Sequence, residues 1–598
     1  MSLHYAPHRT TVERGSKGDL IYRSTAPLGD VAKTTGEWLH RWAAERPHHT
    51  FIAERSGADW RRVSYAETLE LVRAIGASLL ARGMTVDTPI LVISGNSVDH
   101  ALLTLAAQYV GVPTVPLAEQ YALIPQARSR MMDAAAMVKP AMVYAQDTMR
   151  YGDALAMFPD VECVVSEGAG YTTIEDLAKG SDADVDAAFA KVGPDSVVKI
   201  LLTSGSTSAP KAVPTTHKMM CTNQTQLAQS LPFLTDRPPV VVDWLPWNHV
   251  FGGSHNFNAI LANGGSFYID DGKPTPALIG RTVENLKLQC GTLAFNVPVG
   301  FSLLLQAFDR DADLAKAYFQ DLDMIFYAGA SLPQDLWEGF ENYALKYRGS
   351  LPLMTSSWGL TETAPACLIQ QEPIRKSGII GVPMAGVEIK LVPNGDDRYE
   401  TRVKGPNVMT GYLNNPEKTA EAFDEDGYFI TGDAMTFVDP DDYDKGLRFD
   451  GRISEEFKLL TGTWVRAGAL RMDVLAGVVP LATDVVITGS DRADIGVMVF
   501  PHPEHLIALG YSGNDDHGVI VDAAIMDAFA AKLADMQRDG GSSSTRIARA
   551  VILSEPASMP EGEMTAKGNL NFRKIQTRRA DILDRLYQGG AGVITLGK

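Results

Sequence analysis

A run of hydroxyl side chains that ends in a lysine is the first stretch of this sequence with the means to do chemistry. From Thr203 to Ser208, five of the six residues carry a hydroxyl group, Gly205 is the exception, and Lys211 closes the run. Hydroxyl groups, backbone amides and an ammonium group are donors that proteins use to bind phosphate. The run therefore predicts a loop that binds phosphate groups.

The same run departs from the phosphate loop of P-loop ATPases, G-x-x-x-x-G-K-[ST], at two essential positions. Pro210 stands where the second glycine is required, and proline has no N–H to offer a phosphate. Ala212 replaces the hydroxyl residue that binds magnesium in those enzymes. The residues argue against that class of ATPase and leave two interpretations, a different phosphate-binding loop or a Ser/Thr-rich surface turn.

The elements that must position this loop are predicted to alternate between strands and helices. Residues 89–117 show an apolar run, a glycine-bearing turn, an amphipathic stretch of helical length and a second apolar run. Similar apolar runs at 196–204 and 323–330 are followed by helix-like stretches, which begin near His217 and after Pro333. This order predicts an α/β fold whose layers contain a largely parallel sheet.

The pattern changes after Pro383. Short alternating strands separated by Gly, Asn and Pro turns predict a β-rich subdomain at about residues 384–450. A mixed α+β tail follows, with a helix-like segment at 522–539.

Composition narrows the class of partner. The chain has 598 residues and a formal net charge of −18, so nucleic acid or an anionic membrane is not expected as its partner. Its four cysteines are far apart, its first residues have no apolar core, and no stretch has the ~18 apolar residues of a membrane span. We expect a soluble, cytoplasmic protein.

Five motifs, taken in order, resemble those of the adenylate-forming superfamily, which includes acyl-CoA synthetases, luciferases and the adenylation domains of peptide synthetases. The hydroxyl run resembles [ST]-S-G-[ST]-T-G-x-P-K, with Ser208 in the place of a glycine. The other motifs are "WLPWNHVFG", "YAGASLP" with "SWGLTETAP", "GYFITGDAM" and "FDGRISEEFK". We identify the chain as a member of this superfamily on these matches.

The resemblance implies a nucleotide site. Trp358 would stack on adenine, Thr361 would contact the α phosphate, Glu362 would bind Mg²⁺, and Asp433 with Arg452 would bind the ribose. The residues that would hold the phosphates and line the adenine are Thr203, Ser204, Gly205, Ser206, Thr207, Lys211, Gly329, Ala330 and Ser331.

The resemblance also implies a pocket for an organic acid. His249 would border it and move when the acid binds, and its walls would include Val250, Phe251, Gly329 and Gly359. A pocket with these walls could accept a flat ring.

Two domains are expected by the same resemblance, a large N-terminal domain at residues 1–450 and a mobile C-terminal domain at 451–598, with a hinge near 451–454. The C-terminal domain of the family rotates and supplies a lysine, usually within P-x-T-x-x-G-K. In "MPEGEMTAKGNLNFRK" Thr565 fits this motif, Lys567 is the best candidate for the lysine, and Lys574 is the reserve. Ser454 stands where the hinge often has aspartate or lysine.

Three segments look like those of bacterial feruloyl-CoA synthases: "EWLHRWAAERPHHTFIAER", "GRISEEFKLLTGTWV" and "GEMTAKGNLNFRK". This likeness implies ligation of coenzyme A to a hydroxycinnamic acid such as ferulate, p-coumarate or caffeate, with ATP and Mg²⁺, through an acyl-adenylate. Family habit favours a homodimer. The alternatives are a synthetase for another aromatic or medium-chain acid, an adenylation domain that serves a carrier protein, and a non-catalytic nucleotide-binding scaffold.

Overall fold

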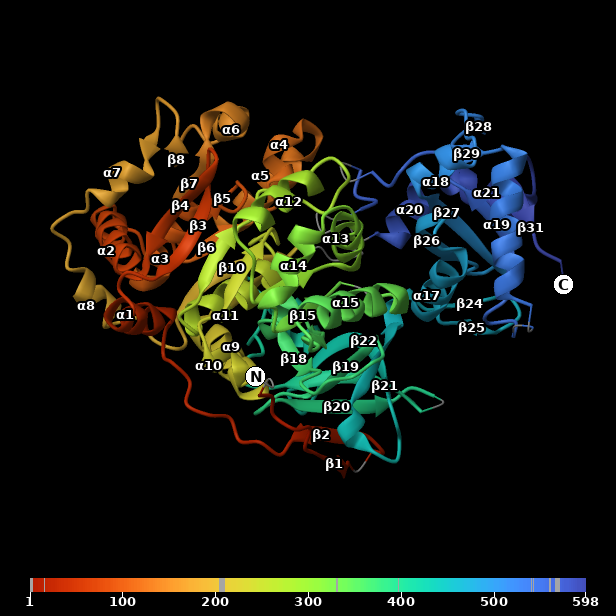
Figure 1. Ribbon diagram of the computed structural model, residues 1–598, viewed down its shortest axis with the longest axis horizontal. Coiled ribbons are helices and arrows are strands. Elements are labelled where there is room, and N and C mark those ends of the chain that lie inside the picture. The colour runs from red at the N-terminus through yellow and green to blue at the C-terminus, as the bar shows by residue number, and fades with distance from the viewer. Residues whose placement is uncertain are drawn as a thin grey trace.

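Two mostly parallel sheets form the first part of the chain in the computed structural model (Figure 1). The structure describes residues 4–15, 17–203, 210–329, 332–395, 397–538, 540, 542–558, 561–564 and 570–597. Across the first sheet the strands are β11 (Lys211–Thr216), β10 (Val197–Thr203), β6 (Thr114–Pro116), β5 (Ile90–Val92), β7 (Met142–Asp147), β8 (Glu162–Glu167) and β9 (Thr172–Thr173). All neighbours run parallel except β10 and β11.

The second sheet repeats this design. Its strands, in order, are β16 (Leu353–Thr355), β15 (Met324–Tyr327), β14 (Leu293–Asn296), β12 (Val240–Asp243), β13 (Ser266–Ile269), β3 (Thr50–Ser56) and β4 (Asp59–Ser64). Only the β3–β4 pair is antiparallel. Because the carboxyl ends of parallel strands share one edge, the loops after β12, β14 and β15 come together there.

Helices pack on both faces of each sheet because successive strand residues point to opposite sides. Ile90 and Val92 of β5 join the core between the sheets, whereas Leu91 joins the outer core. The inner helices are α1 (Thr35–Glu45), α2 (Tyr65–Ala81), α3 (Val98–Val110), α7 (Ile174–Ala178), α8 (Val185–Phe189), α9 (His217–Ser230), α10 (Phe233–Asp236) and α11 (Phe257–Ala262). The sequence-predicted strand, helix and strand at 89–117 are β5, α3 and β6, and the α/β class is confirmed.

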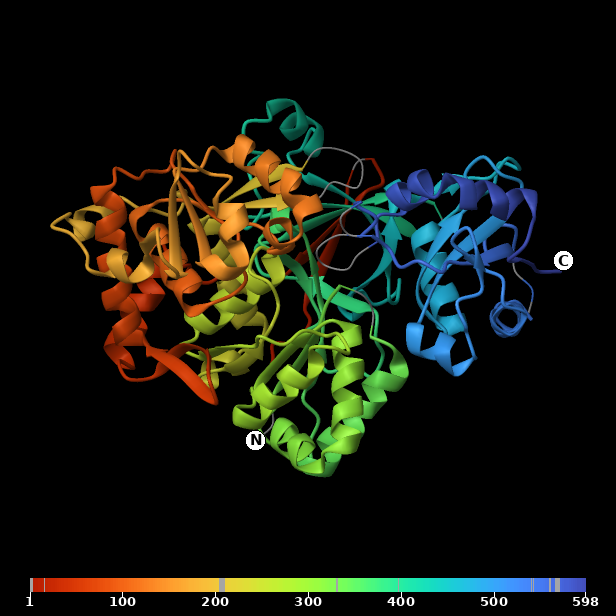
Figure 2. The same ribbon diagram turned by 90° about the horizontal axis from the view of Figure 1, so that it is seen from above.

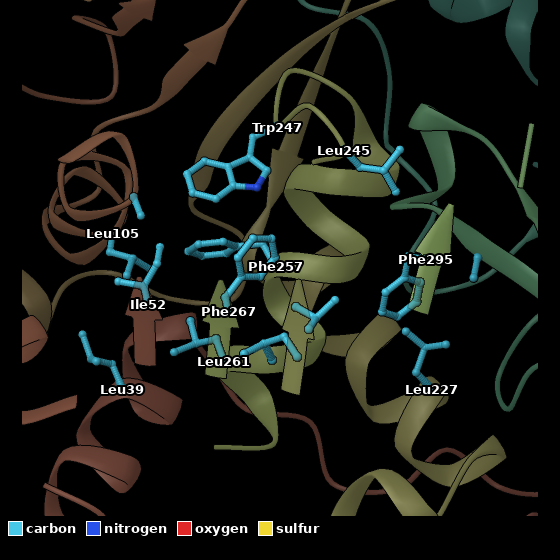
Figure 3. Packing of buried hydrophobic residues seen from close by; sticks show 14 of the residues in the cluster. Leu39, Ile52, Leu105, Leu227, Leu245, Trp247, Phe257, Leu261, Phe267 and Phe295 are labelled. Atoms are coloured by element: carbon cyan, nitrogen blue, oxygen red, sulfur yellow. The ribbon is translucent and has the colours of Figure 1, made fainter. Parts of the chain in front are cut away.

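Other helices cover the outer faces. The first sheet is covered by α4 (Gln120–Leu123), the 3-10 turn Pro125–Ala127, α5 (Arg128–Val138) and α6 (Thr148–Leu155). The second is covered by α12 (Ile279–Leu288), α13 (Pro298–Arg310), α14 (Ala312–Gln320) and α15 (Gln334–Tyr347). Figure 3 shows the inner layer, where Trp247, Phe257 and Phe267 pack side by side between the sheets.

A nine-stranded antiparallel sheet lies beside the two parallel sheets (Figure 1). Its strands, in order, are β1 (Thr10–Arg14), β2 (Leu20–Ser24), β20 (Glu388–Pro393), β21 (Arg398–Lys404), β22 (Phe429–Phe437), β23 (Leu447–Arg452), β19 (Ile379–Pro383), β18 (Ala366–Ile369) and β17 (Ser357–Gly359). Helix α16 (Pro416–Ala422) and the 3-10 turns Thr361–Thr363 and Tyr443–Lys445 lie in its connections.

This sheet is larger than the β-rich segment that we expected at about 384–450. It also includes three strands before residue 384 and the amino-terminal hairpin β1–β2, which pairs with β20. The hairpin carries little local signal, since only Leu20 and Tyr22 of its strands are buried.

The chain beyond residue 456 forms a separate lobe at the right of Figure 1, and the view from above in Figure 2 shows the same separation. Its sheet is β26 (Ala482–Thr488), β27 (Ile495–Pro501), β30 (Ile547–Ile552) and β31 (Val593–Thr595). Helices α17 (Ala467–Val478), α18 (Pro503–Ala508) and α19 (Ala523–Met536) share one core with it, and α20 (Phe572–Arg578) and α21 (Ala580–Gln588) share another. Its hairpins are β24 (Phe457–Lys458) with β25 (Trp464–Val465) and β28 (Asp515–Asp516) with β29 (Val519–Ile520).

An ion-pair cluster spans the junction at residues 451–454. Arg398 of β21 is buried and pairs with Asp450, before the junction, and with Glu456, after it. The junction itself contains Gly451, whose φ of +89° is left-handed, and the 3-10 turn Ile453–Glu455. One guanidinium therefore joins the two sides of the predicted hinge.

Among the helices of the described residues, none combines the length and the apolar character that crossing a bilayer requires.

Candidate active site

The hydroxyl run connects two antiparallel strands, β10 and β11. Thr203 and Lys211 are opposite one another at the ends of antiparallel strands β10 and β11, and the Thr203 hydroxyl donates to the Lys211 carbonyl at 3.4 Å. The predicted phosphate-binding residues Ser204, Gly205, Ser206 and Thr207 lie outside the described residues. An ATPase phosphate loop leads from a strand into a helix. This one leads from a strand into a strand, which supports the sequence argument against that class.

Tyr412 links two of the predicted catalytic residues. Lys211 Nζ donates to the Tyr412 hydroxyl at 2.9 Å, and that hydroxyl donates to Glu362 Oε1 at 3.0 Å. The Lys211 ammonium also lies 4.4 Å from the centre of the Tyr412 ring. The structure thus brings the lysine of the hydroxyl run within one side chain of the predicted magnesium ligand.

Burial keeps the Tyr412 hydroxyl protonated. It raises the pKa of Tyr412 far above the usual value, and the neighbouring Glu362 charge raises it further. A neutral phenol can donate to Glu362 and accept from Lys211 at once. Sequence analysis missed Tyr412, because a tyrosine in a loop carries no charge or spacing signal of its own.

The motifs around Trp358, Asp433 and Arg452 also meet. Trp358 Nε1 donates to Asp433 Oδ2 at 2.9 Å, and Arg452 Nε lies 3.4 Å from Asp433 Oδ1. Asp433 and Arg452 are opposite residues of strands β22 and β23, so the sheet register sets their approach. Three motifs that lie far apart in the sequence therefore form one contact group.

Asp433 is a buried carboxylate with acceptor capacity to spare. Its burial raises its pKa, and the Arg452 charge and the Trp358 hydrogen bond act against that rise. Within the described residues, Oδ1 receives no hydrogen bond of acceptable geometry. An unsatisfied buried carboxylate oxygen suits a ligand that brings hydroxyl donors, such as a ribose.

The structure also shows the local setting of some other predicted site residues. Thr361 begins the 3-10 turn that carries Glu362. A side chain at Gly359 would lie 1.7 Å from the Pro365 carbonyl, so close packing already requires a glycine there. Gly329 follows β15 with a left-handed φ of +86°. The predicted adenine-lining residues Ala330 and Ser331 lie outside the described residues.

The predicted acid-pocket segment leads into a π turn (Phe251–Asn256). His249 Nδ1 accepts the Phe251 N–H at 3.2 Å, and Val250 is buried whereas Phe251 is half-buried. Widened turns of this kind occur often at functional sites. The site role of His249, Val250 and Phe251 stays a prediction.

Two polar side chains bind the carbonyl groups of the π turn. Lys199 Nζ donates to the Gly253 carbonyl at 2.6 Å, and Gln224 Nε2 donates to the Ser254 and His255 carbonyls at 3.3 and 3.2 Å. Lys199 is on β10, and its burial lowers its pKa to about 8. The sequence signal for this residue is a lysine inside the apolar run "VVKILL".

Near the lysine segment of the C-terminal lobe, Gly562 lies close to the large domain. Lys567 lies outside the described residues, as does Thr565. The residues that flank them, Met564 and Leu570, form an antiparallel bridge. Gly562, just before this bridge, lies so near Arg130 of α5 that an added side chain atom would be 2.6 Å from the guanidinium. Lys574, the reserve candidate, is on α20.

The described residues are compatible with a magnesium nucleotide. Outside the segments left undescribed, no group of three or more His, Cys, Asp and Glu side chains could hold a metal by itself. A single carboxylate, Glu362, matches the way Mg²⁺ is held chiefly by phosphate oxygens and water. The unsatisfied Asp433 Oδ1 provides the matching acceptor for the sugar.

Comparisons with known proteins identify the family of the chain. The model of the family described as AMP-binding enzyme matches residues 39–413. The carboxylic acid reductase of Segniliparus rugosus is 24% identical over 425 residues, which is 66% of this chain and 33% of that protein. The feruloyl-CoA synthase of an Amycolatopsis species is 29% identical over 269 residues, 44% of this chain and 51% of that protein. The matched segments thus span a third to a half of these curated relatives.

A solved structure extends the likeness in fold to nearly the whole chain. The A domain of the carboxylic acid reductase from Segniliparus rugosus, in complex with AMP and a co-purified carboxylic acid, matches with a TM-score of 0.70 at 20% identity. The match covers 93% of this chain and 94% of that chain. At this identity the likeness concerns the fold alone.

Replacing Lys199 by methionine should destabilise the large domain by about 1–3 kcal/mol, because the buried π turn loses a hydrogen-bond donor. The folded-state pKa of Lys199, about 8, is below its usual 10.5, so the wild-type protein gains stability as the pH rises between these values. The stability difference between wild type and Lys199→Met should therefore widen over that range. Urea unfolding followed by tryptophan fluorescence measures it.

The matched control is Lys218→Met, which removes an exposed lysine from α9. It should leave the urea midpoint nearly unchanged at each pH. Equal effects of the two substitutions would contradict the structural role of Lys199.

Proposed function

Because the chain belongs to the AMP-binding enzyme family, the adenylate-forming superfamily that its motifs resemble, we propose that it joins coenzyme A to a hydroxycinnamic acid. Ferulate, p-coumarate and caffeate are the proposed acids, ATP is the energy source, and AMP and pyrophosphate are products. The observation that carries this proposal is the meeting of Lys211, Tyr412 and Glu362 beside the buried pair of Trp358 and Asp433.

Two steps are needed because a carboxylate is a poor electrophile. In the first, a carboxylate oxygen of the acid attacks the α phosphorus of ATP, the bond between the α phosphorus and the bridging oxygen breaks, and pyrophosphate leaves. In the second, the thiolate of coenzyme A attacks the carbonyl carbon of the acyl-adenylate, and AMP leaves with the carbon–oxygen bond pair. The thiol proton passes to solvent.

The protein contributes position and charge to the first step, and no covalent bond to the acid. Lys211 would neutralise part of the charge of the leaving pyrophosphate, and the hydroxyl run would donate hydrogen bonds to it. Asp433 would accept hydrogen bonds from the ribose hydroxyls, and the Trp358 N–H would orient its carboxylate. Tyr412 would hold Lys211 and Glu362 in register before the nucleotide arrives.

Magnesium would be held by Glu362 and the phosphates, and when bound it supplies charge neutralisation at the phosphate oxygens. Glu362 is largely buried, so its carboxylate keeps one orientation through its bond to Tyr412. That fixed orientation is the contribution of the chain itself.

The C-terminal lobe would serve both steps by rotating about residues 451–454. In the orientation described here, Gly562, which precedes Lys567, lies near Arg130 of α5 in the large domain. This supports Lys567 as the lysine that stabilises the adenylation step. Rotation would require Arg398 to release Glu456 while its bond to Asp450, on the large domain's side, could persist.

The proposed acid class rests on two observations. The segment after His249 places aromatic side chains, including Phe251, near the carboxyl ends of β14 and β15. A feruloyl-CoA synthase is also among the relatives of the chain. The reductase relative favours a second candidate, activation of an acid for the thiol of a carrier domain in place of coenzyme A.

The purified protein should form a thioester from ferulate only when ATP and coenzyme A are both present, with one pyrophosphate released per thioester. A panel of hydroxycinnamic, benzoic and medium-chain acids, read by absorbance and mass spectrometry, tests the acid class. Pyrophosphate release with no thioester would favour the carrier-protein reading. ATP binding without pyrophosphate release from any acid would identify a nucleotide-binding scaffold.

Changing Glu362 to glutamine should raise the magnesium concentration needed for half-maximal pyrophosphate exchange, because a metal ligand loses its charge. Tyr412→Phe keeps the carboxylate of Glu362 and removes the hydroxyl that donates to it and accepts from Lys211, so we expect a shift in the magnesium requirement of about 10- to 100-fold at most. Exchange rates measured over a magnesium titration give the half-maximal magnesium concentration for each variant. An unchanged magnesium requirement in Glu362→Gln would refute its role as a metal ligand.

Lys567→Ala should lower adenylate formation by about 100- to 1000-fold, the usual effect of removing one donor that stabilises transition-state charge. Thioester formation from supplied feruloyl-adenylate should largely persist, because that step uses the other orientation of the lobe. Lys574→Ala is the matched control. If Lys574→Ala loses adenylate formation but keeps thioester formation, and Lys567→Ala does not, the two assignments must be exchanged.

A further inference from the structure

Four aromatic rings pack together, and one of them, Phe251, is a residue of the predicted acid pocket. They belong to Phe251 and His255 of the π turn, Phe295 of β14 and Phe326 of β15, and all six pairs are in contact. Ring centres are 5.0 Å apart for His255 and Phe326 and 6.0 Å apart for Phe251 and Phe295, the two extremes of the set. A histidine is thus enclosed by three phenylalanines.

The cluster lies at the edge of the sheet where ligands bind in α/β proteins. Phe295 and Phe326 are paired neighbours on β14 and β15, each one residue before its strand ends. Ligands of such sheets occupy the crevice beyond the carboxyl ends of the strands. Phe251 is the half-buried member and the other three rings are buried, so a ligand approaches the cluster past Phe251.

A chain of hydrogen bonds sets the proton position on His255. Asn256 Nδ2 donates to Asp243 Oδ2 at 2.8 Å, which turns the Asn256 carbonyl oxygen toward His255. That oxygen lies 2.9 Å from His255 Nδ1, so Nδ1 must carry the hydrogen and donate it. The Leu245 N–H donates to the other oxygen of Asp243 at 3.0 Å, which holds the carboxylate in place.

The other ring nitrogen of His255 is therefore a bare acceptor. Burial lowers the pKa of His255 to about 4, so the ring is neutral near pH 7, and with its hydrogen on Nδ1 the lone pair is on Nε2. Nε2 is buried and has no hydrogen-bond partner among the described residues. A buried acceptor without a donor is costly and calls for an explanation.

Packing alone does not explain this arrangement. A fourth phenylalanine could fill a space lined by three others, and it would need neither Asn256 nor a buried Asp243 to orient it. Instead, two buried polar side chains, Asp243 and Asn256, orient His255 so that the lone pair of Nε2 faces an apolar enclosure.

We propose that His255 Nε2 accepts a hydrogen bond from a hydroxyl group on the aromatic ring of the acid, so that phenolic acids are selected over acids without that hydroxyl. The inference rests on the proposed function, since it concerns the acid that is adenylated. Phe251 turns aside to admit the ring, which then takes the place of Phe251 and packs against Phe295 and Phe326. A methyl ether has no hydrogen to donate, and it is rejected.

The test compares three acids that differ only at the ring position farthest from the carboxylate: p-coumarate, cinnamate and 4-methoxycinnamate. The readout is kcat/KM for acid-dependent pyrophosphate exchange at about pH 8, above the pKa of about 7 to which burial raises Asp243. Wild type should prefer p-coumarate to cinnamate by about 10-fold or more, the usual effect of one buried hydrogen bond. His255→Phe keeps an aromatic ring and should abolish the preference.

Two further variants separate hydrogen bonding from packing. Phe295→Leu changes the same enclosure without touching a polar atom, so it should alter the rates with all three acids and leave the ratio of p-coumarate to cinnamate near the wild-type value. His255→Gln can present an acceptor oxygen and should recover part of the preference that His255→Phe loses. Loss of the preference in Phe295→Leu as well would overturn the hydrogen-bonding role.

The outcomes also distinguish this inference from the proposed function. If wild type activates none of these acids, the proposed function fails. If it activates p-coumarate and cinnamate equally, or if His255→Phe keeps the wild-type ratio, acid activation stands and the role of His255 is refuted. Equal activation of p-coumarate and cinnamate by the wild type refutes the role of His255 even if both His255 variants fail to fold.

Discussion

The main physical constraint on this site is the burial of charged side chains away from water. A buried ion is tolerated only where hydrogen bonds or an opposite charge replace its water. Asp243, Glu362 and Asp433 each meet this requirement through a partner side chain, and Lys199 meets it through the carbonyl groups of the π turn. The bonds that stabilise the ions therefore also fix where the segments lie. Position and charge, which the adenylation step requires, come from the same contacts.

The architecture brings these ions to one place because of the way parallel strands end. Strands β12, β14 and β15 run in the same direction, so Asp243, Phe295 and Phe326 lie at one edge of one sheet. The antiparallel sheet contributes Trp358, and it sets Asp433 opposite Arg452 by strand register. Both sheets share a core, which makes the site rigid on the side of the nucleotide and the acid. The lobe beyond residue 456 has its own cores, which suits the rotation that we propose.

Much of the fold could be predicted from local pattern, and the exceptions have physical causes. Apolar runs and helical periodicity indicated the α/β layers, since these patterns repeat within each element. The β1–β2 hairpin escaped notice because an edge hairpin buries few side chains, and its pairing with β20 joins residues far apart in the chain. Gly359 is a different case. The motif predicted that it lines the acid pocket, but the nearby Pro365 carbonyl already requires a glycine at this position.

By itself, the sequence determined the kinds of chemistry available and the order of the motifs, because residue type and spacing are local properties. It also supported membership of the AMP-binding family before any contact was visible. Only the tertiary structure decided which side chains meet: Tyr412 between Lys211 and Glu362, and Asn256 between Asp243 and His255. These contacts depend on how distant segments pack and on the direction of each hydrogen bond. Neither leaves a pattern along the chain.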